Sequence, residues 1–147
     1  MNANVQLLME KSMAFNAGDV GALKELWAED AVWHAAGNNA MSGDTRGREA
    51  IGAWFARCNE ILGGDTTVDL QDVLFDDDYV VFFNHMTCHR DGARLEQVHM
   101  NAWRFADGLA VEGWFLPDDV AAFDAFVGAK PAAASRGRLV SRPRTEG

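Results

Sequence analysis

The pattern of apolar and polar positions at the N-terminal end of the chain is helical. Apolar residues recur every three or four positions between Val5 and Phe15, and Gly18 follows where a helix would stop. Asp19 then occupies an N-cap position ahead of a second apolar face over residues 20–27. The pattern predicts one helix from Val5 to Phe15 and a short second helix that pairs with it.

The next segment combines a short strand, a polar loop and a third helix. Residues 31–35 have the pattern of a strand, and the Gly, Asn and Ser content of residues 37–46 is typical of a loop. A helix ending at Gly63-Gly64 follows, because apolar side chains form a stripe at helical spacing: Ile51, Trp54, Phe55, Cys58 and Ile61. Such a stripe favours packing in the core over a cofactor site.

Beyond residue 66 the period of the pattern falls from about 3.6 to about 2, which indicates strands. Four strands are predicted, namely Thr67–Phe75, Tyr79–Arg90, Leu95–Phe105 and Leu109–Leu116. Two of the connections are Asp-Gly pairs, at 91–92 and 107–108, and Asp-Gly is a strong hairpin signal. The strands therefore predict an antiparallel sheet, and Pro117 precedes a last short helix over residues 120–127.

Composition favours one domain with bulky apolar side chains. The chain has 147 residues, of which 48% are hydrophobic, including nine Phe, five Trp and six Met. These values suit a single α+β domain over residues 1–128, with either a filled core or an aromatic-lined cavity. Residues 129–147 carry five basic side chains and one acidic one beside Pro, Ala, Ser and Gly, which predicts a disordered basic tail. A contact of this tail with RNA or an anionic membrane is the alternative.

Charge, cysteines and motifs argue against several classes of function. The net charge of −9 offers a nucleic acid no general attraction. No apolar run approaches the roughly 20 residues of a membrane span, and the N-terminus lacks the pattern of a secretion signal. We therefore expect a cytoplasmic protein without a nucleic-acid or membrane partner. Cys58 and Cys88 lack zinc-ligand spacing, and no phosphate loop or dinucleotide motif is present, so we expect free thiols, no metal and no cofactor.

Several local phrases, together with the order of the elements, resemble one family. The phrases run from Asn16 to Asp19, Leu26 to His34, Gly47 to Ile51 and Trp103 to Gly108. They are similar to recurring phrases of SnoaL-like proteins in the nuclear transport factor 2-like superfamily, which includes ketosteroid isomerases, limonene epoxide hydrolases and polyketide cyclases. The resemblance covers roughly residues 5–127.

The resemblance implies a cystatin-like α+β barrel. In this fold a cone-shaped, curved antiparallel sheet wraps around three N-terminal helices, and a short helix ends the domain. The resemblance also implies a small-molecule pocket at the open end of the cone and a homodimer formed through the outer sheet face. It does not fix the reaction, because this superfamily changes its chemistry by changing pocket residues on one scaffold.

The catalytic positions of ketosteroid isomerases are only partly kept in this sequence. The resemblance aligns Ala35 with the Asp base and Lys11 with the tyrosine of the oxyanion hole. Asn101 aligns with the protonated Asp, and its NH₂ group keeps a hydrogen-bond donor there. The Asp-Arg-Asp relay of limonene epoxide hydrolases has no clear counterpart. We therefore expect any proton transfer to use other residues of the wall.

Strand alternation assembles the first candidate site. The side chains of His99, Asn101 and Trp103 share one strand face. An imidazole titrates near neutral pH, so His99 is a candidate general base or acid, with Asn101 holding an oxyanion. Trp103 would stack on the substrate. A purely structural His–Asn pair is the alternative.

The other candidates come from neighbouring elements. Alternation sends one of Trp33 and His34 inward and the other outward, and the alignment of Ala35 that the resemblance implies favours Trp33 inward. A strand bulge would turn His34 into the pocket instead. Glu112 shares a strand face with Trp114 and could be a second proton-transfer group. His34 and Glu112 are therefore candidate catalytic residues, with packing or surface positions as the alternative. The predicted substrate contacts besides Trp103 are Trp33, Trp114, Phe55, Phe82, Asn84 and Met86.

These observations lead to one function and two alternatives. The leading prediction is a cofactor-independent enzyme of the isomerase or cyclase type, which moves a proton on a small apolar carbonyl or polyketide-like compound. A binding or dimeric interaction module is the first alternative, because it needs only aromatic walls. An epoxide hydrolase that activates water through a histidine and Glu112 is the second.

Overall fold

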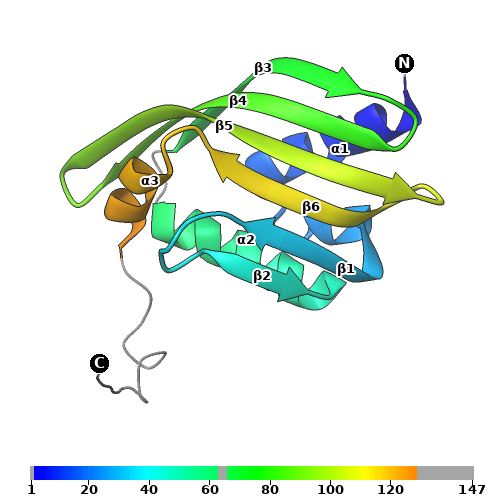
Figure 1. Cartoon of the computed structure of the whole chain (residues 1–147), viewed down its shortest axis with the longest axis horizontal. Coiled ribbons are helices and arrows are strands. Elements are labelled where there is room, and N and C mark those ends of the chain that lie inside the picture. Colours follow the sequence, from blue (N-terminus) through cyan, green and yellow to red (C-terminus); the bar gives the residue numbers. More distant parts are fainter. Residues whose placement is uncertain (1, 63–65, 129–147) are drawn as a thin grey trace, which may run out of the picture.

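The computed structural model describes residues 2–62 and 66–128 and forms an α+β fold (Figure 1). The elements in chain order are α1 (Ala3–Asn16), the 3-10 helix η1 (Ala22–Leu26), β1 (Trp27–Ala35), β2 (Gly43–Arg46), α2 (Arg48–Leu62), β3 (Thr67–Phe75), β4 (Tyr79–Arg90), β5 (Ala93–Ala106), β6 (Leu109–Pro117) and α3 (Val120–Val127). The predicted tail over 129–147 and the predicted helix stop at Gly63-Gly64 lie outside the described residues. No helix in the described ranges is long and apolar enough to cross a membrane.

Six strands form one curved sheet that does not close. Their order is β2-β1-β6-β5-β4-β3, and helices α1 and α2 cover one face while α3 lies near one end (Figure 1). The predicted antiparallel pairing is confirmed for β3 to β6, which follow one another through hairpins. The sheet as a whole is mixed, because β1 pairs with β6 in parallel. A parallel pair needs a long connection, and here the chain from α2 to β5 supplies it.

Two predicted elements differ from the structure. The second helix is only the five-residue η1, and Trp27 already begins β1 in an extended conformation, with its side chain fully buried. The expected N-cap moves from Asp19 to Gly21. The polar loop after β1 also contains a strand, because Gly43–Arg46 pairs antiparallel with the end of β1. Polar residues are tolerated in β2 because it is an edge strand that is largely exposed.

The predicted turns are present. Asp91 and Asp107 have φ values of 51° and 52°, and each is followed by a glycine that also has a positive φ. This geometry suits Asp-Gly hairpins, since aspartate and glycine tolerate the left-handed region. In the acidic turn before β4, the Asp76 carboxylate accepts hydrogen bonds from the backbone N–H groups of Asp78 and Tyr79, both at 2.8 Å. The acidic run is therefore a turn that caps its own backbone.

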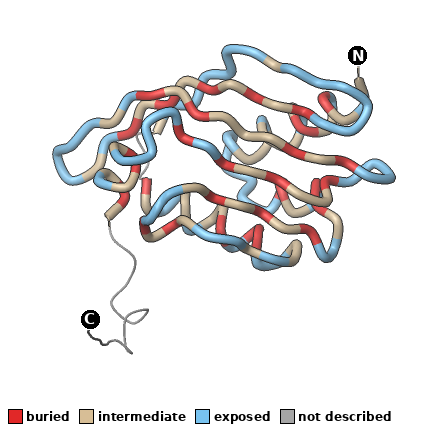
Figure 2. Tube along the Cα trace, viewed as in Figure 1, coloured by how far each residue is buried: buried red, intermediate tan, exposed pale blue. Residues whose placement is uncertain are grey.

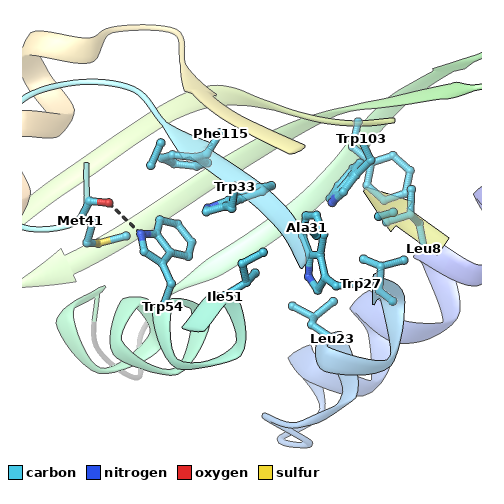
Figure 3. Packing of buried hydrophobic residues seen from close by; sticks show 14 of the residues in the cluster. Leu8, Leu23, Trp27, Ala31, Trp33, Met41, Ile51, Trp54, Trp103 and Phe115 are labelled. Carbon is cyan, nitrogen blue, oxygen red and sulfur yellow. Dashed lines mark hydrogen bonds between the residues drawn. The ribbon is translucent and has the colours of Figure 1, made fainter. Parts of the chain in front are cut away.

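The core lies between the helices and one face of the sheet, and its centre is aromatic. Buried and less buried residues alternate along β4 and β5 (Figure 2), as expected for strands with one face on the core. Trp33 is fully buried, and its ring lies 5.5 Å from those of both Trp27 and Trp54 (Figure 3). The indole N–H of Trp54 donates a 2.7 Å hydrogen bond to the carbonyl oxygen of Met41, which fixes α2 against the loop after β1.

Candidate functional site

A cavity of about 780 Å³ lies between the helices and the inner face of the sheet. Aromatic and aliphatic side chains of α1, η1, α2 and β3 to β6 line most of it. Several lining residues are exposed, among them the apolar Met13 on α1 and Val68 and Leu70 on the edge strand β3. The cavity is therefore open to solvent on a side that these residues border. The volume and the apolar lining are those of a small-molecule site.

Strands β4 and β5 build the sheet wall of this cavity. Their register sets Asn84 directly opposite His99, and Phe82 directly opposite Asn101. Because side chains alternate along both strands, every second residue faces the cavity. The structure accordingly brings together on this wall six of the predicted site residues: Phe82, Asn84, Met86, His99, Asn101 and Trp103. Phe55 lines the same cavity from α2.

His99 is the buried titratable group of the sheet wall. Only 5% of the residue is exposed, and its ring packs 5.0 Å from the ring of Phe115. Burial lowers the pKa of His99 to about 4, so its ring is neutral at pH 7. The side-chain NH₂ of Asn84 lies 3.4 Å from Nε2 of His99. In the described part of the chain, His99 Nδ1 and Asn101 Oδ1 are buried without a hydrogen-bond partner.

The part of the cavity wall that residues 2–62 and 66–128 form carries no charge at neutral pH. None of the described lining residues is an Asp, Glu, Lys or Arg. Besides His99, the ionisable group among the described lining residues is the thiol of Cys58, and burial raises its pKa to about 12. The polar groups of the wall are therefore neutral amides, hydroxyls, a thiol and an imidazole. A neutral, largely apolar ligand fits such a wall, since a charged ligand would lose its hydration without a partner.

The two other candidate catalytic residues lie on the opposite face of the sheet. His34 Nδ1 lies 2.7 Å from Asp44 Oδ1, and His34 Nε2 lies 2.7 Å from Glu112 Oε2. Its ring stacks on Trp114 at 5.6 Å. Arg104 extends the cluster through a 3.4 Å contact with Glu112. Partial burial lowers the pKa of His34, but the hydrogen bonds and charges of Asp44 and Glu112 outweigh this, so the pKa lies above its ordinary value.

Three residues that were predicted for the cavity wall lie elsewhere in the structure. His34, Glu112 and Trp114 do not line the cavity, because Val32–Ala35 pairs in regular register with both neighbouring strands and alternation is not interrupted there. Trp33 points inward as predicted, but it is packed in the aromatic core and does not line the cavity either. The pairing of β1 with β6 does have an irregularity, but it lies between Trp27 and Val32, so it does not turn His34 into the cavity.

Comparison with known proteins identifies the family. The model of the SnoaL-like domain matches residues 6–113. The chain belongs to the SnoaL-like family. No curated protein matches this SnoaL-like chain.

Solved structures agree with this family and its fold. Bal32a, from a soil-derived mobile gene cassette, is 35% identical, with 86% of this chain and 97% of that chain covered and a TM-score of 0.79. A protein of unknown function with a cystatin-like fold from Xanthomonas campestris is 26% identical, with 87% and 99% covered and a TM-score of 0.77. An NTF2-like protein of unknown function from Burkholderia pseudomallei K96243 is 20% identical, with 88% of this chain and 100% of that chain covered and a TM-score of 0.77. At this identity the likeness is evidence for the fold and not for the function. The predicted cystatin-like fold and the nuclear transport factor 2-like superfamily are confirmed.

Apart from Phe55, sequence reasoning missed the helical side of this SnoaL-like cavity. Ser12 and Asn16 of α1 line it, as do Trp54 and Cys58 of α2. Trp54 and Cys58 belong to the apolar stripe of α2, whose spacing indicates burial but not which buried residues border a space. Of the three isomerase-aligned positions, Asn101 lines the cavity. The positions of the base and the tyrosine do not, since Ala35 is buried elsewhere and Lys11 pairs with Glu25 at 2.6 Å.

The two remaining histidines, His85 and His89, lie on the outer surface of the protein, away from the cavity. His85 pairs with Glu96 at 2.8 Å, and His89 is exposed near the end of β4. Within residues 2–62 and 66–128, no group of three or more His, Cys, Asp or Glu side chains is arranged to hold a metal ion.

Proposed function

We propose that this SnoaL-like protein is a cofactor-independent enzyme of the isomerase or cyclase type. It transfers a proton on a small, uncharged carbonyl compound, such as a polyketide-like one, held in the cavity. The observation that carries the proposal is His99, a buried and neutral imidazole two residues from Asn101 on the wall of an aromatic cavity whose described lining carries no charge. His99 is the proton-transfer residue and Asn101 the donor to the substrate oxygen.

The lining supports this choice of substrate class. The cavity volume of about 780 Å³ is within the usual range for a small-molecule site, and Phe55, Phe82 and Trp103 supply flat apolar surfaces. A carbonyl group needs only a few hydrogen-bond donors to be oriented, and the amides of Asn84 and Asn101 provide them. A carboxylate or an ammonium group would find no opposite charge among the described lining residues.

The chemistry follows from the protonation state of His99. A neutral imidazole takes a proton from the carbon next to the carbonyl. The C–H electron pair forms a double bond to the carbonyl carbon, and the π pair of the C=O bond moves to the oxygen, where Asn101 donates a hydrogen bond. In a substrate with a further double bond conjugated with this enolate, the imidazolium then returns the proton to the far carbon, which completes an isomerisation. In a cyclisation the enolate carbon instead forms a bond to a second carbonyl carbon, and the new alkoxide takes the proton from His99. A base of pKa about 4 is adequate for enolisation, since the Asp base of ketosteroid isomerase has a pKa of about 4.6.

Hydrogen–deuterium exchange tests the proposal before the natural substrate is known. Uncharged polycyclic ketones are screened by their displacement of N-phenyl-1-naphthylamine, a neutral fluorophore. Ligands that bind are then incubated with protein in deuterated buffer, and exchange beside the carbonyl is followed by NMR. We expect His99→Gln to slow this exchange by about 10²- to 10⁴-fold, while displacement of the fluorophore changes little.

The matched control is His34→Gln, the same substitution on the outer face of the sheet, which should leave the exchange rate unchanged. Full exchange in His99→Gln would remove His99 from the reaction. The charged fluorophore 1-anilinonaphthalene-8-sulfonate adds a second readout. It should bind the cavity more weakly than the neutral fluorophore, because the described wall offers its sulfonate no cation.

A ligand-binding module without catalysis is the second candidate. It is favoured by the absence of a carboxylate from the described cavity wall and by the loss of the isomerase base and tyrosine at Ala35 and Lys11. Ligands that bind tightly, with no exchange and no turnover, would decide for this function. Water activation through Glu112 is not carried forward, because that carboxylate lies on the outer face beside His34.

A further inference from the structure

Asn84 and His99 form a buried polar pair on the cavity wall. The register of β4 and β5 places them directly opposite each other, and the two residues are only 7% and 5% exposed. Directly opposite residues on neighbouring strands have Cβ atoms about 5 Å apart, which is close enough for their side chains to meet. The contact between Asn84 Nδ2 and His99 Nε2 measures 3.4 Å. The backbone pairing itself therefore holds the amide beside the ring.

The chemistry of this contact selects one form of the ring. A neutral imidazole has one nitrogen that donates and one that accepts, whereas the NH₂ group of an asparagine only donates. If Nε2 faces the NH₂ group, Nε2 carries the lone pair and Nδ1 carries the proton. The opposite tautomer would bring two donors together in a buried place, which is unfavourable.

We propose that Asn84 is a positioning residue that holds the neutral ring of His99 in the tautomer with its proton on Nδ1 and its lone pair on Nε2. The accepting nitrogen is then the one beside Asn84, a residue that itself lines the cavity. The Nδ1–H group, which has no partner among the described residues, is left free to donate to an oxygen of the ligand. The tautomer does not depend on the proposed function, but its consequence for catalysis does.

In the proposed reaction Asn84 can also form a hydrogen bond with the imidazolium form of His99. Nε2 has a single lone pair, so the NH₂ group of Asn84 must turn away before Nε2 takes a proton from the substrate. The protonated Nε2 is then a donor, which this NH₂ group no longer suits. Turning the amide by half a rotation presents Oδ1, which accepts the new N–H. An asparagine can serve both states, whereas a leucine can serve neither and an aspartate accepts in both.

Nitrogen NMR tests the tautomer directly. Long-range ¹H–¹⁵N correlation spectra of ¹⁵N-histidine protein distinguish a protonated from an unprotonated ring nitrogen, and His99→Gln identifies the signals of His99 among the four histidines. We expect wild-type His99 to carry its proton on Nδ1 at neutral pH. In Asn84→Leu the proton should redistribute between the two nitrogens. In Asn84→Asp it should move to Nε2, because a carboxylate accepts from it.

A control and a second readout separate positioning from mere structure. Asn101→Leu removes the other amide of the same wall and should leave the tautomer of His99 unchanged. With a ligand that exchanges, the acid limb of the rate profile should move up by about one pH unit or more in Asn84→Asp, because a nearby carboxylate raises the pKa of the ring.

Two results would overturn the inference. One is wild-type His99 with its proton on Nε2. The other is an unchanged wild-type tautomer in folded Asn84→Leu. If Asn84→Leu does not fold, the wild-type spectrum and Asn84→Asp decide alone, and the same tautomer in both would count against Asn84. The expected tautomer without any deuterium exchange would leave this inference standing and refute the proposed function.

Discussion

The two faces of the sheet shift the pKa of a histidine in opposite directions. On the inner face, His99 is almost fully buried against Phe115, and burial lowers its pKa to about 4. On the outer face, His34 lies between Asp44 and Glu112, and its pKa is above the ordinary value despite partial burial. At neutral pH the inner ring is neutral, whereas the outer ring keeps its proton to a higher pH than an ordinary histidine does. The fold thus places an uncharged histidine on the cavity wall and an ion-paired one away from the cavity.

The difference extends beyond the two histidines. Ion pairs of the described sheet residues lie on the outer face, in the His34 cluster and in the pair of Glu96 with His85 and Arg94. The described lining of the cavity contains no carboxylate, ammonium or guanidinium group. Among buried apolar side chains hydrogen bonds are stronger than in water, but charges are costly. The proposed reaction therefore relies on neutral groups of the described wall, namely His99 and the amides of Asn84 and Asn101.

The largest expected effect is on stability in acid. Burial lowers the pKa of His99 from 6.5 to about 4 in the folded protein, so the neutral ring contributes stability that is full above pH 6.5 and is lost as the pH falls through 4. The loss should reach about 3 kcal/mol. Urea unfolding between about pH 7.5 and about pH 4, compared with His99→Gln, measures it. Equal pH dependence in both proteins would show that His99 does not lose a proton on folding.

The next effect concerns the packing of the inner face. A Cβ atom on Gly113 of β6 would lie 2.7 Å from atoms of both Trp27 and Trp33, which is too close for a buried contact. We expect Gly113→Ala to destabilise the protein by about 1–3 kcal/mol, because the two indoles cannot move apart without strain. Gly21→Ala is the matched control, since the nearest atom to its Cβ is 3.8 Å away and its φ is negative. Denaturant unfolding of both variants measures the difference, and similar values would argue against a tightly packed core here.

The sequence predicted the local part of the fold. Asp91-Gly92 and Asp107-Gly108 specify hairpins through their own backbone preferences, and the stripe of α2 follows from helical spacing. The parallel pairing of β1 with β6 could not be predicted, because it joins segments about 80 residues apart and leaves no local signal. The edge strand β2 was missed for a related reason, since its four polar residues become a strand only by pairing with β1.

The residues of the candidate site likewise fall into those that the local sequence pattern predicted and those that it did not. Alternation placed His99, Asn101 and Trp103 on one face, and the structure finds all three on the cavity wall. Alternation together with the alignment of Ala35 also sent His34 outward, and only the possibility of a bulge kept it among the wall candidates. Only Phe55 of the opposite, helical wall was predicted, because a helical stripe shows burial without showing where the packing leaves a space. Cys58 is the clearest case, as a stripe residue that lines the cavity.

The smallest expected effect lies on the outer face and has the opposite dependence on pH. Because the pKa of His34 is raised, its pairs with Asp44 and Glu112 contribute stability below pH 6.5 that is lost as the pH rises through the folded-state pKa. Glu112→Gln removes one of the two carboxylates, so it should lower the pKa of His34 in an NMR titration and cost at most about 1 kcal/mol of stability near pH 6, as for other partly exposed pairs. It should leave the binding of N-phenyl-1-naphthylamine unchanged, since Glu112 does not line the cavity. Weaker binding of the fluorophore to Glu112→Gln would show that the outer cluster is not separate from the cavity. An unchanged pKa of His34 in this variant would show that Glu112 does not raise that pKa.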